Sequence, residues 1–232
     1  MLLGIFISAG TWQLRRADEK SALENAFSAG TAATTTGLPI DDLQAAEYRY
    51  RRFELYGHYL PEKQILLDNI VQDGRVGYQV LTPFRTGSQT ILVNRGWVPA
   101  DLDRTVLPAV PVAAGDREIS ARLNFLPRAG IKIASAESMD HGWPQRMLYP
   151  SRDELSAALD LAVPDYQLWL DADQPDGYER EWKAVAVGPA RHYGYAIQWF
   201  AFAALAILFY VLLTVRWKRR QDEAPDMDLP DD

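Results

Sequence analysis

An uncharged apolar stretch near the carboxyl end constrains this chain more than any other feature. The 23 residues from Tyr193 to Val215 contain no Asp, Glu, Lys, Arg or His. At 1.5 Å of rise per residue, a helix of this length extends about 35 Å, which is enough to cross a hydrocarbon core of about 30 Å. Aromatic residues lie near both ends, as is typical of membrane interfaces: Tyr193, Tyr195, Trp199, Phe209, Tyr210 and Trp217. We therefore predict a transmembrane helix over residues 192–215.

A second apolar window lies at the start of the chain, from Met1 to Leu14. As a helix it extends only about 21 Å. The small residues 8–10 would suit a signal peptidase, but no basic residue precedes the apolar stretch, so a cleaved signal is the less favoured alternative. We expect an uncleaved first transmembrane helix over residues 1–14, shortened at its amino end. Because residues 13–27 contain no Gly or Pro, helical structure should continue to about Phe27.

The charges around the second window predict an orientation. Basic residues follow it directly: Arg216, Lys218, Arg219 and Arg220. Under the positive-inside rule this end is cytoplasmic, and two spans then place residues 15–191 outside. Three basic residues just after Leu14 oppose the rule locally, but long translocated domains tolerate such charges. We expect residues 216–232 to form a disordered cytoplasmic tail, because residues 221–232 are acidic and contain two prolines.

Alternating apolar residues predict strands in the segment 15–191. Within residues 52–59, the side chains of Phe53, Leu55 and Tyr59 share one face, with Gly57 between them. Further strands are expected over residues 64–68, 78–84, 90–98, 119–125 and 166–170, and residues 99–111 are expected to be irregular. The predicted fold is thus a strand-rich, antiparallel domain outside the membrane.

One helix should interrupt these strands. Ser151 is followed three residues later by Glu154, the spacing of a capping box, and then by Leu155 and Leu159. We therefore expect an α+β domain in which a single helix packs on antiparallel strands, flanked by the two transmembrane helices.

Composition excludes several kinds of site. The chain has no cysteine, which rules out disulfides, thiolate zinc sites and covalent haem attachment, and it disfavours a copper chaperone. The net charge of −7 argues against a nucleic-acid partner. The sequence contains no G-x-S-x-G, H-E-x-x-H or phosphate-binding glycine motif, so no enzyme class is indicated.

Four consecutive residues near the end of the strand predicted over residues 90–98 form a candidate cluster. It consists of Asn94, Arg95, Gly96 and Trp97. On one interpretation, Arg95 and Trp97 are presented to a protein partner. On the other, which we favour, Arg95 meets an acidic neighbour while Gly96 permits close packing around Trp97.

The three histidines differ in what surrounds them. His58 lies on the polar face of a predicted strand, and His141 lies in a predicted loop. His192 stands at the outer mouth of the second span, with Tyr195 and Trp199 on the same helix face three and seven residues later. Such an imidazole could be an axial haem ligand, with Arg191 meeting a propionate. The alternative is a polar residue that only anchors the helix at the interface.

Four blocks of sequence, together with Lys20, carry a resemblance to a known family. They are residues 10–16 (GTWQLRR), 77–83 (GYQVLTP), 92–99 (LVNRGWVP) and 192–200 (HYGYAIQWF). In their order and spacing they resemble the surfeit locus protein one (Shy-one) family, whose members are assembly factors for cytochrome c oxidase. The resemblance spans the chain from Gly10 to about Arg216.

The resemblance implies a role in maturing haem-copper oxidases. It implies transient binding of haem a through His192, insertion into the large catalytic subunit of the oxidase, and contact with haem-a synthase, all in a bacterial inner membrane. Two alternatives stay open: a scaffold that binds protein partners without haem, and a membrane-anchored enzyme with a pocket in the outer domain.

Overall fold

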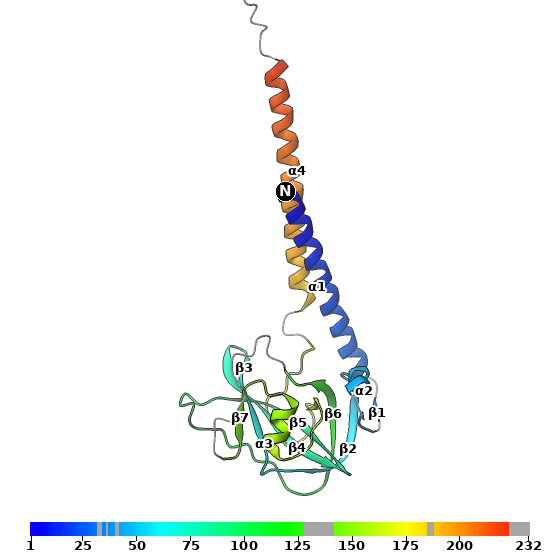
Figure 1. Cartoon of the computed structure of the whole chain (residues 1–232), viewed down its shortest axis with the longest axis vertical. Coiled ribbons are helices and arrows are strands. Elements are labelled where there is room, and N and C mark those ends of the chain that lie inside the picture. The colour runs from blue at the N-terminus through cyan, green and yellow to red at the C-terminus, as the bar shows by residue number, and fades with distance from the viewer. Residues whose placement is uncertain (32–33, 36, 40–41, 128–141, 185–187, 223–232) are drawn as a thin grey trace, which may run out of the picture. The chain divides into compact units, whose positions relative to one another are not determined.

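Two long helices, one near each end of the sequence, and eight strands between them form most of the regular structure that is described (Figure 1). The computed structural model describes residues 1–31, 34–35, 37–39, 42–127, 142–184 and 188–222. The chain divides into two compact units, Asn25–Ala184 and the remainder at both ends. Each unit is therefore described by itself. His141, predicted to lie in a turn, falls outside the described residues.

The two terminal helices, α1 (Leu2–Thr31) and α4 (Pro189–Asp222), pack against each other in antiparallel fashion. Near the start of α1, the ring of Phe6 contacts Phe202 at 5.8 Å between centroids. Seven residues further along α1, Gln13 contacts His192 near the start of α4. As expected from the lack of a breaker, α1 continues beyond Phe27.

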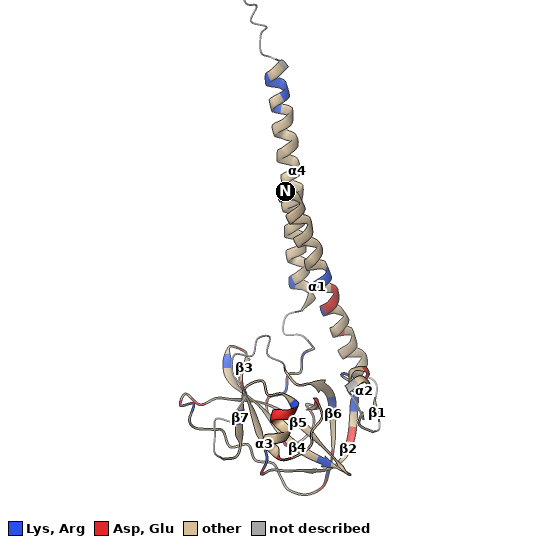
Figure 2. Cartoon of the chain, in the orientation of Figure 1, with Lys and Arg blue, Asp and Glu red and all other residues tan. Residues whose placement is uncertain are grey.

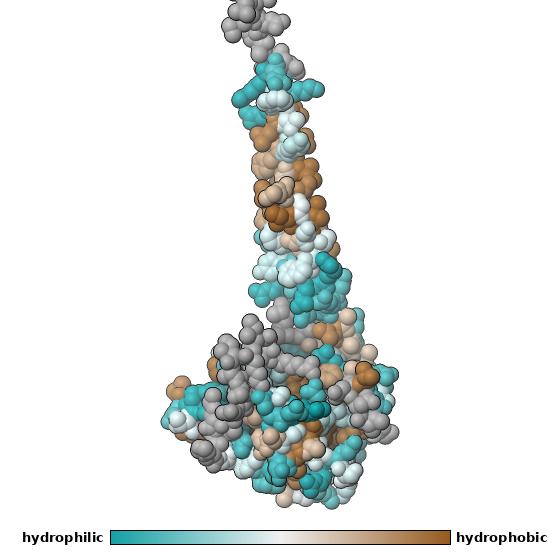
Figure 3. Space-filling view, viewed as in Figure 1, coloured by the Kyte–Doolittle hydropathy of each residue, from teal (hydrophilic) through white to brown (hydrophobic). Residues whose placement is uncertain are grey.

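Only one of the described helices is long and apolar enough to cross a membrane, namely α4 over Pro189–Gln221. Figures 2 and 3 show its middle without charged residues and rich in hydrophobic ones. The apolar part of α1 ends before Arg15, and this helix does not meet the same criterion. The second predicted span is thus supported by composition and length, whereas the first stays a prediction.

The tail prediction needs a correction, because α4 continues to Asp222 and residues 216–222 are helical rather than disordered. Arg219 and Arg220 occupy the last turn, where cations interact favourably with the helix dipole. Residues 223–232 lie outside the described part of the chain.

Five strands of the central unit close into a barrel. They are β2 (Arg52–Tyr59), β6 (Arg117–Phe125), β8 (Tyr166–Leu170), β5 (Gln89–Pro99) and β4 (Arg75–Thr86), paired in that order. The ring closes because β2 also pairs with β4, with Tyr59 opposite Phe84. A single apolar cluster fills the interior with side chains from all five strands, among them Phe53, Phe84, Val93, Ile119 and Leu168.

Shorter elements surround the barrel. The first half of β4 pairs with β3 (Ile65–Gln72), which in turn pairs with the short strand β7 (Gln145–Met147). Two residues of β1 (Thr34–Thr35) extend the sheet at β2, and α2 (Asp42–Glu47) lies between them in sequence. These last elements, β1, α2 and β7, were not predicted.

The helix α3 (Arg152–Leu159) forms as the capping box predicts. The Ser151 hydroxyl accepts a hydrogen bond from the Glu154 backbone, and the Glu154 carboxylate accepts one from the Ser151 backbone at 2.7 Å. Leu155 and Leu159 are fully buried in a second apolar cluster with residues of β3, β4 and β5, so α3 covers the outer face of these strands.

The sequence predicted a purely antiparallel sheet, but the sheet is mixed. The pairs β1–β2, β3–β7 and β5–β8 are parallel. For β8 the reason is geometric: it lies between β6 and β5, which run in opposite directions, so it can be antiparallel to only one of them. The alternation predicted for β2 is confirmed, since Phe53, Leu55, Gly57 and Tyr59 are all buried.

Candidate functional site

His192 lies in the first turn of α4 and is held by a side chain of α1. Its Nδ1 is 2.8 Å from Oε1 of Gln13, and both side chains are half-buried. With the Gln13 amide oriented as in the structure, its Oε1 can only accept, so the contact is a hydrogen bond in the tautomer whose Nδ1 carries the proton. In that tautomer the lone pair is on Nε2, which has no hydrogen-bond partner within the described ranges. The arrangement leaves one ring nitrogen able to bind a metal.

Small residues allow α1 to approach α4 closely enough for this contact. Gly10 and Ala17 are buried on α1, seven residues apart, and Ala196 is buried on α4. A Cβ added at Gly10 would come 2.8 Å from the ring of Phe200, so a larger residue there requires that ring to move. Gln13 lies between the two small residues of α1, on the same face.

The other residues proposed for the haem site differ in whether α1 contacts them. The ring of Trp199 stacks on Phe6 of α1, with centroids 5.9 Å apart and planes at 29°. Tyr195 is 44% exposed and Arg191 is exposed. The structure therefore directs His192 and Trp199 toward α1, while Tyr195 and Arg191 stay open to a ligand or a partner.

Two polar residues of α1 that contact the start of α4 were not predicted. Gln13 contacts His192, and Asp18, outside the haem site, accepts a hydrogen bond from the Tyr193 hydroxyl at 3.2 Å. The signal that could have identified Gln13 is its polar side chain inside an apolar window.

The cluster Asn94–Trp97 is buried in the barrel unit. Asn94 is fully buried, Arg95 and Trp97 are each 1% exposed, and Gly96 adopts a φ of 111°. A Cβ at Gly96 would come 2.7 Å from the carbonyl oxygen of Glu179. Burial on this scale leaves no surface for a partner, which supports the structural interpretation.

Arg95 joins several segments through neutral acceptors. Its guanidinium donates to Oε1 of Gln64 and to backbone carbonyls of Val110, Pro111 and Asp176, at 2.6 to 3.3 Å. The expected acidic neighbour of Arg95 is Asp176, but Arg95 bonds the backbone carbonyl of this residue, whereas the carboxylate of Asp176 pairs with Arg117. Burial lowers the pKa of Arg95. Burial also raises the pKa of Tyr59, whose ring Arg95 contacts, to about 12.

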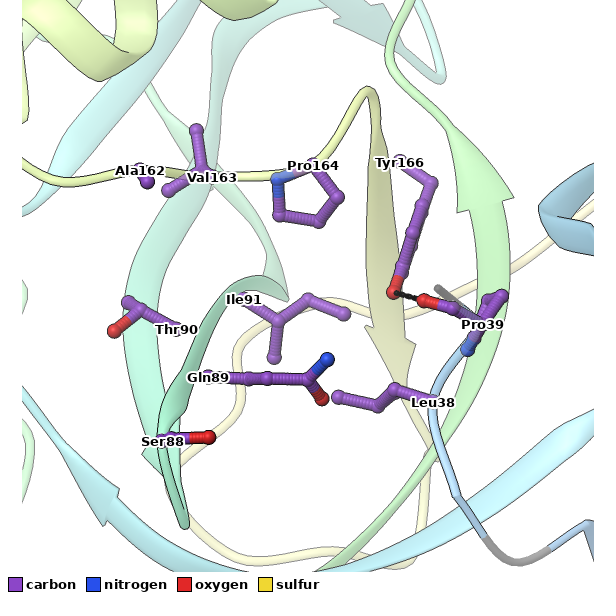
Figure 4. A pocket seen from close by; sticks show the side chains of 10 residues that line it. All are labelled: Leu38, Pro39, Ser88, Gln89, Thr90, Ile91, Ala162, Val163, Pro164 and Tyr166. Carbon is purple, nitrogen blue, oxygen red and sulfur yellow. Dashed lines mark hydrogen bonds between the residues drawn. The ribbon is translucent and has the colours of Figure 1, made fainter. Parts of the chain in front are cut away.

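A pocket of about 410 Å³ lies in the barrel unit between the start of β5 and the segment before β8 (Figure 4). Among the described residues, its lining contains no Asp, Glu, Lys, Arg or His, and the hydroxyl of Tyr166 donates to the carbonyl oxygen of Pro39 at 3.1 Å. Tyr59 and Arg95, whose pKa values are shifted by burial, are not among the described residues of this lining.

The chain combines a small β-barrel domain with apolar helical anchors. This combination defines a class of protein, the membrane-anchored barrel proteins. The model of the SURF1 family matches residues 1–204. The chain therefore belongs to the SURF1 family, which is known for assembly factors of cytochrome oxidase.

Individual relatives agree with this assignment. An uncharacterized SURF1-like protein of Mycobacterium tuberculosis is 27% identical over 235 residues, covering 97% of this chain and 85% of the relative. A SURF1-like protein of Rickettsia felis is 26% identical, covering 90% and 91%. Surfeit locus protein 1 of Takifugu rubripes is 32% identical over 107 residues, covering 39% and 45%.

Proposed function

We propose that this chain is a non-enzymatic assembly factor for cytochrome c oxidase that binds haem a through His192 and aids its insertion into the large catalytic subunit. Family membership supports the assembly role. The observation that carries the haem proposal is the contact between His192 Nδ1 and Gln13, which leaves Nε2 available as a ligand. Haem-a synthase is the second proposed partner, because it supplies the haem.

The residues around His192 fit a haem. When bound, a haem supplies an iron centre whose axial position accepts an imidazole nitrogen. His192 would provide that nitrogen, and the exposed ring of Tyr195 would offer apolar surface to the macrocycle, while Trp199 holds α4 against Phe6 of α1. Arg191 is exposed one residue before the histidine, where its guanidinium can pair with a propionate.

The proposed location is a bacterial inner membrane, with α1 and α4 as anchors and the barrel domain in the periplasm. The uncharged middle of α4 and the basic residues at its end support this orientation. Haem a and the large catalytic subunit are themselves membrane-bound, so a ligand at the membrane boundary is suitably placed to pass haem between proteins.

Co-expression with the enzymes of haem a synthesis tests the proposal. The purified full-length protein should show a haem a absorption spectrum, and His192→Ala should lose it at unchanged protein abundance. His58→Ala, a histidine of the barrel unit, is the matched control and should retain the spectrum. A spectrum that persists in His192→Ala would exclude this ligand, and wild-type protein without haem would favour a scaffold that binds only protein partners.

A further inference from the structure

We infer that Gln13 is a positioning residue for His192: its amide oxygen keeps the proton on Nδ1 and so presents Nε2 to the haem iron. The inference rests on the proposed function. The acceptor for the His192 ring comes from α1, whereas the ligand itself is on α4. The two residues are 179 positions apart in sequence, so α4 alone cannot supply this contact.

The hydrogen bond fixes both the tautomer and the ring orientation. A neutral imidazole can carry its proton on either nitrogen, and the partner of one nitrogen decides which. At 2.8 Å, Gln13 Oε1 is within ordinary hydrogen-bond distance of Nδ1. Ring rotation about the side-chain bonds of His192 would break this contact, so the acceptor also limits where Nε2 points.

An amide acceptor has a specific chemical consequence. A carboxylate in the same place would pull the Nδ1 proton more strongly and give the imidazole more imidazolate character, which makes it a stronger donor to iron. An apolar residue would leave Nδ1 without an acceptor and permit the other tautomer. A neutral amide lies between these limits, which suits a protein that holds haem and then releases it.

The packing of α1 against α4 supplies the support that a positioning residue needs. On the amino-terminal side of Gln13, the stacked rings of Phe6 and Trp199 hold the two helices together. On its carboxyl-terminal side, the hydrogen bond from Tyr193 to Asp18 joins them. Because Tyr193 contacts α1 without touching the imidazole, Tyr193→Phe removes a helix–helix hydrogen bond while leaving His192 and Gln13 intact. It is therefore the matched control.

The test uses the full-length protein co-expressed with haem a synthesis, comparing wild type with Gln13→Leu, Gln13→Glu and Tyr193→Phe. Haem a affinity and the midpoint potential of the bound haem are both measured. Gln13→Leu should weaken binding about 10- to 100-fold and raise the potential, because the imidazole becomes a weaker donor. Gln13→Glu should retain haem and lower the potential, and Tyr193→Phe should change neither quantity.

The outcomes separate this inference from the proposed function. Haem lost in His192→Ala but bound with unchanged affinity and potential in Gln13→Leu overturns the role of Gln13 alone. Equal losses in Gln13→Leu and Tyr193→Phe also overturn it, since helix docking would then be the cause. Wild-type protein without haem, or haem retained in His192→Ala, overturns the proposed ligand and the positioning role together.

Discussion

The indole Nε1 of Trp97 donates a hydrogen bond to the carbonyl oxygen of Ile70 at 3.0 Å. This bond joins β5 to the bulged part of β3, across the strand between them. Gly77 on that intervening strand makes the contact possible, because a Cβ there would come 2.5 Å from the indole ring. Trp97 thus fills a space that only a glycine neighbour leaves open.

Trp97→Ala should lower the free energy of unfolding by about 3 to 5 kcal/mol, because it creates a cavity and removes the Ile70 hydrogen bond. Chemical denaturation of the detergent-solubilised protein, followed by circular dichroism, measures the change. Trp143→Ala is the control, since Trp143 is 43% exposed and should cost little. Unchanged stability combined with lost oxidase assembly would instead identify Trp97 as part of a partner surface.

Arg95→Met should lower the free energy of unfolding by about 3 kcal/mol or more. The backbone carbonyls of Val110 and Pro111, which accept hydrogen bonds from Arg95, would lose their donor. Arg95→Lys should be destabilising as well, since one ammonium group cannot replace the guanidinium fork. Arg85→Met, at an exposed position of β4, provides the comparison in the same denaturation experiment. Equal stability of the Arg95 and Arg85 variants would contradict the buried network.

The pKa of Tyr59 predicts a loss of stability at high pH. Burial raises its pKa from 10.0 to about 12, so between these values the folded protein holds a proton that the unfolded chain has released. Stability therefore falls as the pH rises through this window, by up to about 2 to 3 kcal/mol. Tyr59→Phe should lose this part of the slope while remaining as stable as wild type at pH 7. Parallel stability curves for the two proteins from pH 9 to 12 would refute the assignment.

The proposed topology predicts the outcome of reporter fusions. A periplasm-active reporter joined after Lys20 and a cytoplasm-active reporter joined after Arg220 should both be active, because two spans place these positions on opposite sides. Reversing the two reporters is the control and should give no activity. Same-side signals would mean that the first window does not span the membrane.

Local signals in the sequence were enough to predict several elements. The face shared by Phe53 and Leu55, and the capping box at Ser151, each depend on residues a few positions apart, and both are confirmed. The parallel pairing of β8 with β5 depends on where a distant strand inserts, which no local pattern encodes. The contact between Gln13 and His192 was missed for the same reason, since only helix packing brings them together.

The position of β8 in the sheet determines when the barrel can form during synthesis. This strand lies between β5 and β6, although it is the last of the described strands along the chain. Until Tyr166–Leu170 has emerged from the translocation machinery, β5 and β6 each have an unpaired edge, and such edges pair readily with other chains. A chain cut before Tyr166 should aggregate rather than fold, so the central unit depends on one late, buried pentapeptide to become soluble.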